Sequence, residues 1–406
     1  MISIHSEPQP TELGDVRVAN RAVVLRHVRR HAPCSRADIA AHTGLNKATV
    51  SSLVGELIDR RLLRETGLTE NRVGRPATML VLDGAPYAAL GMQIGADELV
   101  VLAIDLAGTR LLTWRRAFAA PSSSPAETVR ALAALARRAI TRMNGQGRRV
   151  LGLTVGVPGL VDADGAVPRA TALGWRDVAL AADLRAALRE PELTVHVDTD
   201  ANLAVLAEHR HGPYAGTAHL VHLTGGAALG AGIVGGGRLL RGGRGFAGEA
   251  GHLTLDPTGP ACACGRRGCL AAVAGLPAVV RRVLPDAEHD GPVTDYLPEI
   301  ERIQALARQD DPTVLAALAD VGCHVGHAAA ILANLLNPEA VLLGGHFAAL
   351  APWLLPAARA ELAARTHAPL AGGCRLDASS LGSAATALGG ATAALAAVES
   401  GRLPAA

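Results

Sequence analysis

The sequence has few aromatic residues and almost no lysine. Nine of its 406 residues are Phe, Trp or Tyr, so Ala, Leu and Val must pack most of a core drawn from the 49% of hydrophobic residues. Lys47 is the only lysine, and arginine carries almost all of the positive charge. The formal net charge of +2 is close to neutral and favours no class of partner for the chain as a whole.

Signals for export and for membrane insertion are also lacking. Residues 1–8 contain no basic start followed by an apolar run, so no signal peptide is indicated. No uninterrupted apolar stretch is long enough to cross a bilayer. We therefore expect a cytoplasmic protein without a membrane partner, and the length predicts two or three domains.

Four residues that bind soft metals lie close together in the sequence. His252 is followed, after nine residues, by Cys262, Cys264 and Cys269. Three thiolates and one imidazole complete a tetrahedral zinc site and leave no position open for catalysis. The pattern therefore predicts a structural Zn²⁺ ion.

Two glycines within this cluster, Gly265 and Gly268, give the backbone the freedom to bring the sulfurs together. The alternative is a chance cluster of reduced, partly buried thiols. A disulfide suits the pattern less, because an intracellular chain keeps its thiols reduced. The remaining cysteines, Cys34, Cys323 and Cys374, stand alone and are predicted to be ordinary packed thiols.

The first 85 residues have the spacing of a small helical domain. The period of the apolar positions predicts a helix over residues 22–28, which Pro33 ends. A second helix over 36–43 starts at a capping-box pattern and stops at Gly44, which suits a left-handed turn. A third helix follows a cap at Asn46. Two short helices around a glycine turn predict a helix-turn-helix.

The next segment predicts a wing, which is a β-hairpin beside the recognition helix. Strands over 63–65 and 78–82 flank a polar, basic loop over 66–76. Polar side chains at the start of the third helix and arginines on the wing would contact the bases and phosphates of double-stranded DNA. A small helical oligomerisation module is the alternative. The candidate DNA-binding residues are Asn46, Lys47, Thr49, Ser51, Ser52, Arg72 and Arg75.

The rest of the chain alternates strands and helices. Strands are predicted over 89–94, 99–105, 109–117 and 150–157, and a capped helix precedes the last of them. A comparable alternation follows Val195. We expect two related α/β lobes with a cleft between them, where ligands of such folds tend to bind.

Polar and glycine-rich motifs fall at the ends of predicted strands, over 156–162, 198–202, 225–232 and 337–345. Each motif alone is a weak signal, because glycine runs often mark only close packing of the backbone. Their order along the chain, together with the metal cluster, is the informative feature.

Taken together, these motifs resemble the ROK family (repressors, open reading frames and sugar kinases). The resemblance runs from about residue 20 to residue 389, and the segment 249–269 is similar to the signature and zinc site of the family. It implies an α/β fold with an N-terminal winged helix-turn-helix followed by a two-lobed, actin-like ATPase fold. Family members that carry the N-terminal domain are transcription factors.

The resemblance also assigns effector-binding residues. In the family, the histidine at the position of His252 shapes the sugar pocket, and the glutamate at the position of Glu249 contacts sugar hydroxyls. Asp200 stands where the kinases have the base that accepts the proton of the attacking hydroxyl. The alternatives are a helix-capping carboxylate for Asp200 and a partner that orients His252 for Glu249.

The nucleotide side departs from the kinase pattern. Gln93 stands where the first phosphate loop of the family has an aspartate that helps to hold Mg²⁺, and Ala227 and Ala228 replace a hydroxyl and a glycine of the second loop. Phosphoryl transfer depends on such groups, and the loss of one preorganised contact can cost on the order of 100-fold in rate. We therefore expect no enzymatic activity, although Asp200 keeps an active sugar kinase open as the alternative.

The sugar side is incomplete too, because Ala172 and Ala271 replace an asparagine and a glutamate of the family pattern. The cleft therefore binds an altered sugar, a sugar derivative or no effector. We expect a zinc-containing transcriptional regulator, most simply a repressor, that works as a homodimer or a homotetramer. The expected domains are a DNA-binding domain over 1–85, a first lobe over 86–200 and a second lobe over 201–406. Whether the last helix returns to the first lobe stays open.

Overall fold

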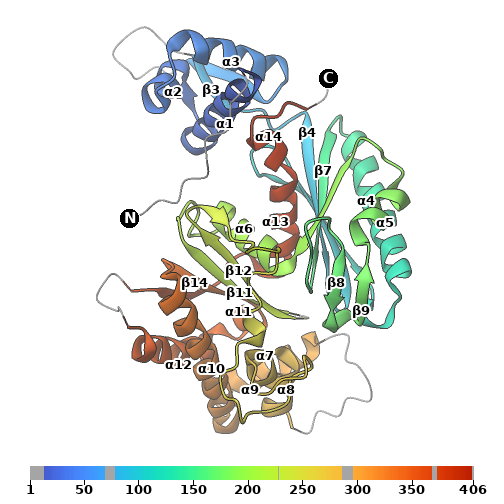
Figure 1. Ribbon diagram of the computed structural model, residues 1–406, viewed down its shortest axis with the longest axis vertical. Helices are drawn as coiled ribbons and strands as arrows, with labels where there is room; N and C mark the ends of the chain where they lie inside the picture. Colours follow the sequence, from blue (N-terminus) through green and yellow to red (C-terminus); the bar gives the residue numbers. More distant parts are fainter. Residues whose placement is uncertain (1–12, 69–77, 227, 286–295, 368–372, 405–406) are drawn as a thin grey trace.

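The computed structural model describes residues 13–68, 78–226, 228–285, 296–367 and 373–404. A small N-terminal domain lies above two α/β lobes, each built on its own sheet (Figure 1). The C-terminus lies beside the N-terminal domain and not at the far end of the second lobe (Figure 1).

The N-terminal domain packs three helices against a three-stranded sheet of order β1-β3-β2. Its elements are α1 (Leu13–His31), β1 (Cys34–Ser35), α2 (Arg36–Thr43), α3 (Lys47–Asp59), β2 (Leu63–Leu68) and β3 (Thr78–Leu82).

The local signals predicted in this domain are confirmed. The hydroxyl of Ser35 accepts the backbone N–H of Asp38, whose carboxylate accepts the backbone N–H of Ser35, so α2 begins with a capping box. Gly44 ends α2 in the left-handed conformation with φ +75°. The first helix is longer than predicted, because its first turns are largely exposed and carry no apolar period.

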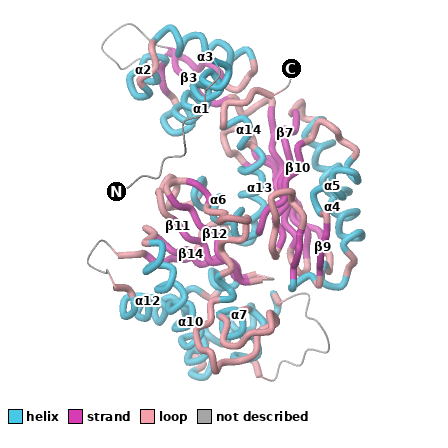
Figure 2. The backbone as a smooth tube through the Cα atoms, viewed as in Figure 1, coloured by secondary structure: helices cyan, strands magenta, loops and turns pink. Residues whose placement is uncertain are grey.

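The first lobe is built on a five-stranded sheet of order β10-β7-β4-β5-β6, in which β4, β7 and β10 are parallel. Helices α4 and α5 cover one face, and α13 covers the other (Figure 2). Its elements are β4 (Tyr87–Ile94), β5 (Glu98–Ile104), β6 (Arg110–Ala117), α4 (Pro125–Asn144), β7 (Arg149–Val157), β8 (Val167–Ala170), β9 (Trp175–Val178), α5 (Leu180–Leu188), β10 (Thr194–Thr199) and α13 (Ala385–Ala394).

The second lobe is built on a five-stranded sheet of order β13-β12-β11-β14-β15. One face packs against α7 to α12, and the other faces α6, which lies between the two lobes. Its elements are α6 (Asp200–His211), β11 (Leu220–Gly225), β12 (Leu229–Gly235), β13 (Arg238–Leu239), α7 (Leu270–Ala274), α8 (Leu276–Val283), α9 (Leu297–Arg308), α10 (Pro312–Leu336), β14 (Ala340–Gly345), α11 (His346–Ala349), α12 (Ala351–Arg365) and β15 (Arg375–Ala378).

Helix α13 packs against α6 and against β4 through glycines. A Cβ atom at Gly389 would clash with the carbonyl oxygen of Leu203 on α6, and one at Gly91 would clash with the carbonyl oxygen of Ala387 on α13. The last long helix therefore lies against the sheet of the first lobe, with its backbone in direct contact with α6.

Helix α10 is the one helix in the described part of the chain that is long and apolar enough to cross a membrane. It packs instead along α12, where a Cβ atom at Gly326 would clash with the carbonyl oxygen of Ala358. This close backbone contact is that of a core helix.

The isolated cysteines differ in exposure. Cys34 is buried, as predicted, and burial raises the pKa of its thiol to about 11. The prediction was wrong for Cys323, which lies on the exposed face of α10. Cys374 is only partly buried.

We predict opposite effects for two Gly→Ala substitutions in helices. Gly389→Ala forces a methyl group into the α6–α13 contact and should lower the free energy of unfolding by about 2 kcal/mol or more. Gly55→Ala in α3 meets nothing within 4 Å and should raise it by roughly 0.5–1 kcal/mol through helix propensity. Thermal unfolding measures both. An unchanged Tm for Gly389→Ala would contradict the close contact.

Candidate functional site

The four predicted metal ligands converge. One ligand atom from each of His252, Cys262, Cys264 and Cys269 lies within 4.8 Å of the others. The Cys262 Sγ–His252 Nδ1 distance is 3.8 Å, and the Cys264 Sγ–Cys269 Sγ distance is 3.7 Å. A tetrahedral ion with metal–sulfur bonds of about 2.3 Å would set sulfurs about 3.8 Å apart, whereas a disulfide bond is about 2.05 Å long. The cluster can hold a metal ion and contains no disulfide.

A tight turn forms the cluster. The backbone N–H of Cys262 donates to the carbonyl of Arg266 at 2.8 Å, and the N–H of Gly265 donates to the carbonyl of Cys262 at 2.9 Å. Gly265 has φ +90° and Gly268 has φ +66°, and a Cβ atom at Gly268 would clash with the carbonyl oxygen of Asp256. Both glycines are therefore required by the backbone, as the sequence predicts.

The thiols of the cluster shift one another's pKa values in opposite directions. Burial, followed by the adjoining thiols, raises the pKa of Cys269 to about 12. A hydrogen bond from the backbone of Arg266 lowers the pKa of Cys264. Burial lowers the pKa of His252 and favours the neutral imidazole, which is the form that binds metals. A cation bound here would offset the repulsion among thiolates.

The loop that leads to His252 lies flat on β12. Gly248 has φ +101°, and a Cβ atom there would clash with the carbonyl oxygen of Ala231. A Cβ atom at Gly251 would clash with the carbonyl oxygen of Leu229. These glycines fix the 3-10 helix Ala250–His252, which carries a metal ligand at one end and follows directly on Glu249.

Asp200 is the first residue of α6 but not its cap. The hydroxyl of Thr199 accepts the backbone N–H of Asn202 at 3.1 Å and caps the helix, while the carboxylate of Asp200 accepts the backbone N–H of Ala201 in the same first turn at 2.8 Å. Desolvation is the largest cause that raises the pKa of Asp200 to about 7, and the charge of Glu249 adds to it. The two carboxyl groups therefore lie close enough to influence each other's charge.

The residue Glu249 is exposed, and partial burial of its carboxyl group raises its pKa. The backbone N–H of His252 donates to the carbonyl oxygen of Glu249 at 3.0 Å. In the described part of the chain, no hydrogen bond joins the Glu249 carboxylate to the imidazole ring. The geometry thus gives no support to Glu249 as the group that orients His252.

The nucleotide side of the cleft contains a neutral amide. Gln93 lies near the end of β4, beside Gly156 of β7, and its Oε1 is buried without a hydrogen-bond partner among the described residues. Ala228 begins the turn into β12, while Ala227 lies outside the described residues.

An ion pair between a buried aspartate and an exposed arginine, which the sequence analysis missed, joins the two lobes. Asp198 at the end of β10 is 4% exposed and pairs with Arg241 of the second lobe at 2.6 Å. The side-chain amide of Asn202 donates to the same carboxylate at 2.8 Å. The available signal was the arginine–glycine run over 241–248, which leads directly to Glu249.

The predicted recognition helix α3 is amphipathic. Val50, Leu53 and Leu57 are buried against the domain, while Lys47 and Ser51 are exposed. Ser52 is exposed too, and Thr49 is partly buried. Arg72 and Arg75 lie outside the described residues.

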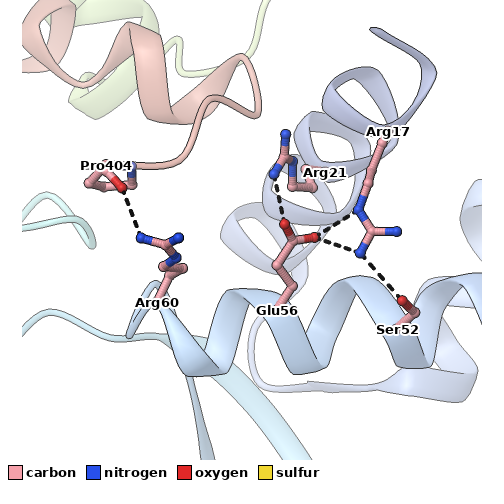
Figure 3. Close-up of polar contacts among 6 residues, drawn as sticks. All are labelled: Arg17, Arg21, Ser52, Glu56, Arg60 and Pro404. Carbon is pink, nitrogen blue, oxygen red and sulfur yellow. Dashed lines mark hydrogen bonds and ion pairs between the residues drawn. The ribbon is translucent and has the colours of Figure 1, made fainter. Parts of the chain in front are cut away.

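Several of these polar side chains are already engaged. The side-chain oxygen of Asn46 accepts the backbone N–H of Thr49 at 2.7 Å, so Asn46 caps α3. Arg17 of α1 donates to the hydroxyl of Ser52 at 3.4 Å and to the carboxylate of Glu56 at 2.9 Å (Figure 3). The surface that remains for a ligand is centred on Lys47 and Ser51.

Comparison with known proteins agrees with this division of the chain. Residues 89–397 match the ROK family, and residues 19–71 match the MarR family of winged-helix domains. The xylose repressor of Bacillus subtilis (strain 168) is 31% identical over 375 residues, which cover 92% of this chain and 94% of that protein. The DNA-binding transcriptional dual regulator NagC of Escherichia coli (strain K12) is 28% identical over 351 residues, which cover 84% of each chain.

Solved structures show the same relationship. A ROK family transcriptional regulator, described as a homolog of the E. coli MLC protein, superposes with a TM-score of 0.78 at 28% identity and covers 96% of this chain and 98% of that one. A ROK family glucokinase from Streptomyces griseus, in complex with glucose and AMPPNP, superposes with a TM-score of 0.62 at 28% identity and covers 75% of this chain and 98% of that one. The fold is a MarR-like winged helix-turn-helix joined to an actin-like kinase fold, and the chain belongs to the ROK family.

Proposed function

We propose that the protein is a DNA-binding transcriptional repressor whose degenerate kinase-like domain binds a sugar or sugar derivative and controls carbohydrate-related genes. The observation that carries the proposal is the exposed polar start of α3, on a winged helix-turn-helix that relatives named as repressors share. We also propose a cytoplasmic location and the domain boundaries given above, at residues 85 and 200.

DNA recognition would use the first turn of α3. Lys47 is exposed at the N-terminal end of the helix, where the helix dipole and the free backbone N–H groups also attract phosphate. Ser51, one turn further on, can reach a base edge. Arg72 and Arg75 would add contacts from the wing.

A homodimer or homotetramer suits this mode of binding. One recognition helix reads only a few base pairs, and two half-sites spaced by one helical turn supply the specificity. A ligand that favours one arrangement of the lobes would change the distance between the two heads and so the affinity for the operator.

The effector would bind between Asp200, Glu249 and His252. The charge of Glu249 raises the pKa of Asp200, so the two carboxyl groups lie near each other, and carboxylates accept sugar hydroxyls well. The neutral Gln93 on the nucleotide side opposes turnover of ATP. The second candidate function is an active hexose kinase, which the pKa of Asp200 near 7 favours, since that value suits a general base.

Zinc is the metal we propose for the four-ligand cluster, held by His252, Cys262, Cys264 and Cys269. The sulfur-rich, tetrahedral set and the absence of an open position fit a structural ion. The ion would fix the loop that carries Glu249 and His252 beside the cleft.

A substitution in α3 tests DNA binding. Lys47→Ala should weaken binding to a labelled duplex about 10-fold and lower the slope of log K against log salt by about 1, because one phosphate contact is lost. Fluorescence anisotropy at several salt concentrations measures both quantities. The control is Arg142→Gln, which removes the same charge from an exposed position of α4. It should change neither the affinity nor the salt slope. If both variants bound the duplex with the same affinity and salt slope, the start of α3 would not be part of the DNA interface.

Two cysteine substitutions, one inside the cluster and one outside it, test the metal site. Cys264→Ser should lower the zinc content from about one ion per chain, because a serine hydroxyl is a poor zinc ligand. Cys323→Ser changes an exposed cysteine outside the cluster and should keep the full content. Elemental analysis of the purified proteins measures the content. Normal zinc in Cys264→Ser would refute the ligand set.

The cleft makes a pH-dependent prediction. Since the pKa of Asp200 is about 7, its carboxylate is largely protonated at pH 6 and ionised at pH 8. A sugar hydroxyl prefers the ionised acceptor, so affinity should rise several-fold over this range and the rise should be absent in Asp200→Asn. Thermal shift with a panel of sugars measures binding.

A coupled ATPase assay with the same sugars distinguishes the two candidate functions. Sugar binding without ATP turnover is the expected result. Phosphorylated sugar above background would establish the kinase. In the binding measurements, a sugar affinity that does not change with pH would show that Asp200 is not part of the pocket.

A further inference from the structure

A second cavity lies outside the cleft. A crevice of about 910 Å³ opens between α1 of the N-terminal domain, the edge strand β10 of the first lobe and the β12–β13 turn of the second. None of the effector residues or metal ligands named above lines it. Its walls come from three units of the fold and include residues of α13 and of α14 (Ala396–Glu399).

Positive charge dominates the walls. Six arginines face three carboxylates, Asp162, Asp198 and Glu399. Asp198 pairs with Arg241, and the carboxylate of Asp162 accepts two backbone N–H groups of its own turn. The third carboxylate, Glu399, is shared between two arginines, Arg29 at 2.9 Å and Arg210.

Three arginines of the crevice remain without a partner. Arg26 and Arg30 project from α1, and Arg238 comes from β13 of the second lobe. None of the three forms an ion pair or a side-chain hydrogen bond within the described part of the chain. All three side chains are exposed, and an anion bound among them would gain from their positive charge.

The floor of the crevice is apolar, with one unpaired hydroxyl. Leu25, Leu62 and Leu395 line it and are at most 5% exposed. Thr154 of β7 also lines it, and this residue is 2% exposed with no hydrogen-bond partner for its Oγ1 among the described residues. A buried polar group without a partner is uncommon and points to a missing ligand.

We propose that this crevice binds a small organic phosphate, whose phosphate group lies among Arg26, Arg30 and Arg238 and whose apolar part lies on the leucine floor. Guanidinium groups bind phosphate through paired, charge-assisted hydrogen bonds. The volume falls within the range of about 300–1,000 Å³ that is typical of small-molecule sites. Walls on three sides, with a floor of buried leucines, suit a small molecule better than the backbone of a DNA duplex.

The position of the crevice gives such a ligand a regulatory effect. Glu399 on α14 (Ala396–Glu399) joins Arg29 of the N-terminal domain to Arg210 in the last turn of α6, and Asp200 is the first residue of that same helix. A phosphate would compete with Glu399 for Arg29 and Arg210. It would therefore loosen one of the contacts that hold the N-terminal domain. This consequence for DNA rests on the proposed function, whereas binding itself does not.

Isothermal titration of the full chain with phenyl phosphate and inorganic phosphate tests the site. We expect one phenyl phosphate per chain, bound at least 10-fold more tightly than inorganic phosphate because the ring covers the leucine floor. The triple variant Arg26→Gln, Arg30→Gln, Arg238→Gln should bind phenyl phosphate at least 10-fold more weakly. The matched control is a triple of exposed arginines of the first lobe, Arg116→Gln, Arg142→Gln and Arg185→Gln, which removes the same charge and should bind like the wild type.

Three results would overturn the proposal. An equal loss of phenyl phosphate affinity in both triple variants would mean non-specific attraction. A loss of affinity in Asp200→Asn would place the anion at the proposed effector site. The absence of saturable phenyl phosphate binding would exclude the site outright. If the triple variant fails to fold, the single variants Arg238→Gln and Thr154→Val test the site instead. Each should weaken phenyl phosphate binding several-fold and leave DNA binding in the absence of phosphate unchanged. Retained affinity in both would refute the site.

Discussion

The architecture depends on the close contact of α6 with α13 between the two sheets. Glycine at position 389 lets the backbones of these helices touch, so α6 cannot shift without moving the last helix and the C-terminal residues that follow it. The two ends of α6 face different sites: Asp200 faces the cleft, and Arg210 faces Glu399 and the N-terminal domain. A single rigid helix therefore spans the distance between the proposed effector site and the DNA-binding domain.

The C-terminal segment completes this connection. Gly401 has φ +88°, and a Cβ atom there would clash with the carbonyl oxygen of Val18 on α1. Arg60, at the end of α3, donates to the carbonyl oxygen of Pro404 at 3.4 Å (Figure 3). Residues 401–404 thus lie against α1 and the end of α3, where a small displacement of α13 would reach the proposed DNA-binding surface.

The features that could be predicted from the sequence are those formed by residues near one another in the chain. The capping boxes at α2 and α4, the glycine turn before α3 and the metal cluster all join side chains to groups a few residues away, and residue types with their spacing suffice to identify them. The pairs Asp198–Arg241 and Arg29–Glu399 were missed, because each joins segments that only the tertiary fold brings together. The exposure of Cys323 was missed for a related reason: an apolar helix does not reveal which of its faces packs. The crevice has walls from three distant segments and leaves no local pattern.

The central claim is that this ROK chain has kept its metal cluster and cleft, lost the charge at its nucleotide side and works by occupying specific sites on DNA. Genome-wide footprinting with the purified, zinc-loaded chain tests it most directly. The account predicts a small set of protected sites with two-fold symmetric half-sites, whose occupancy changes when a sugar that stabilises the protein is added. A folded chain that protects no site on genomic DNA, at any concentration at which it stays soluble, would contradict the account.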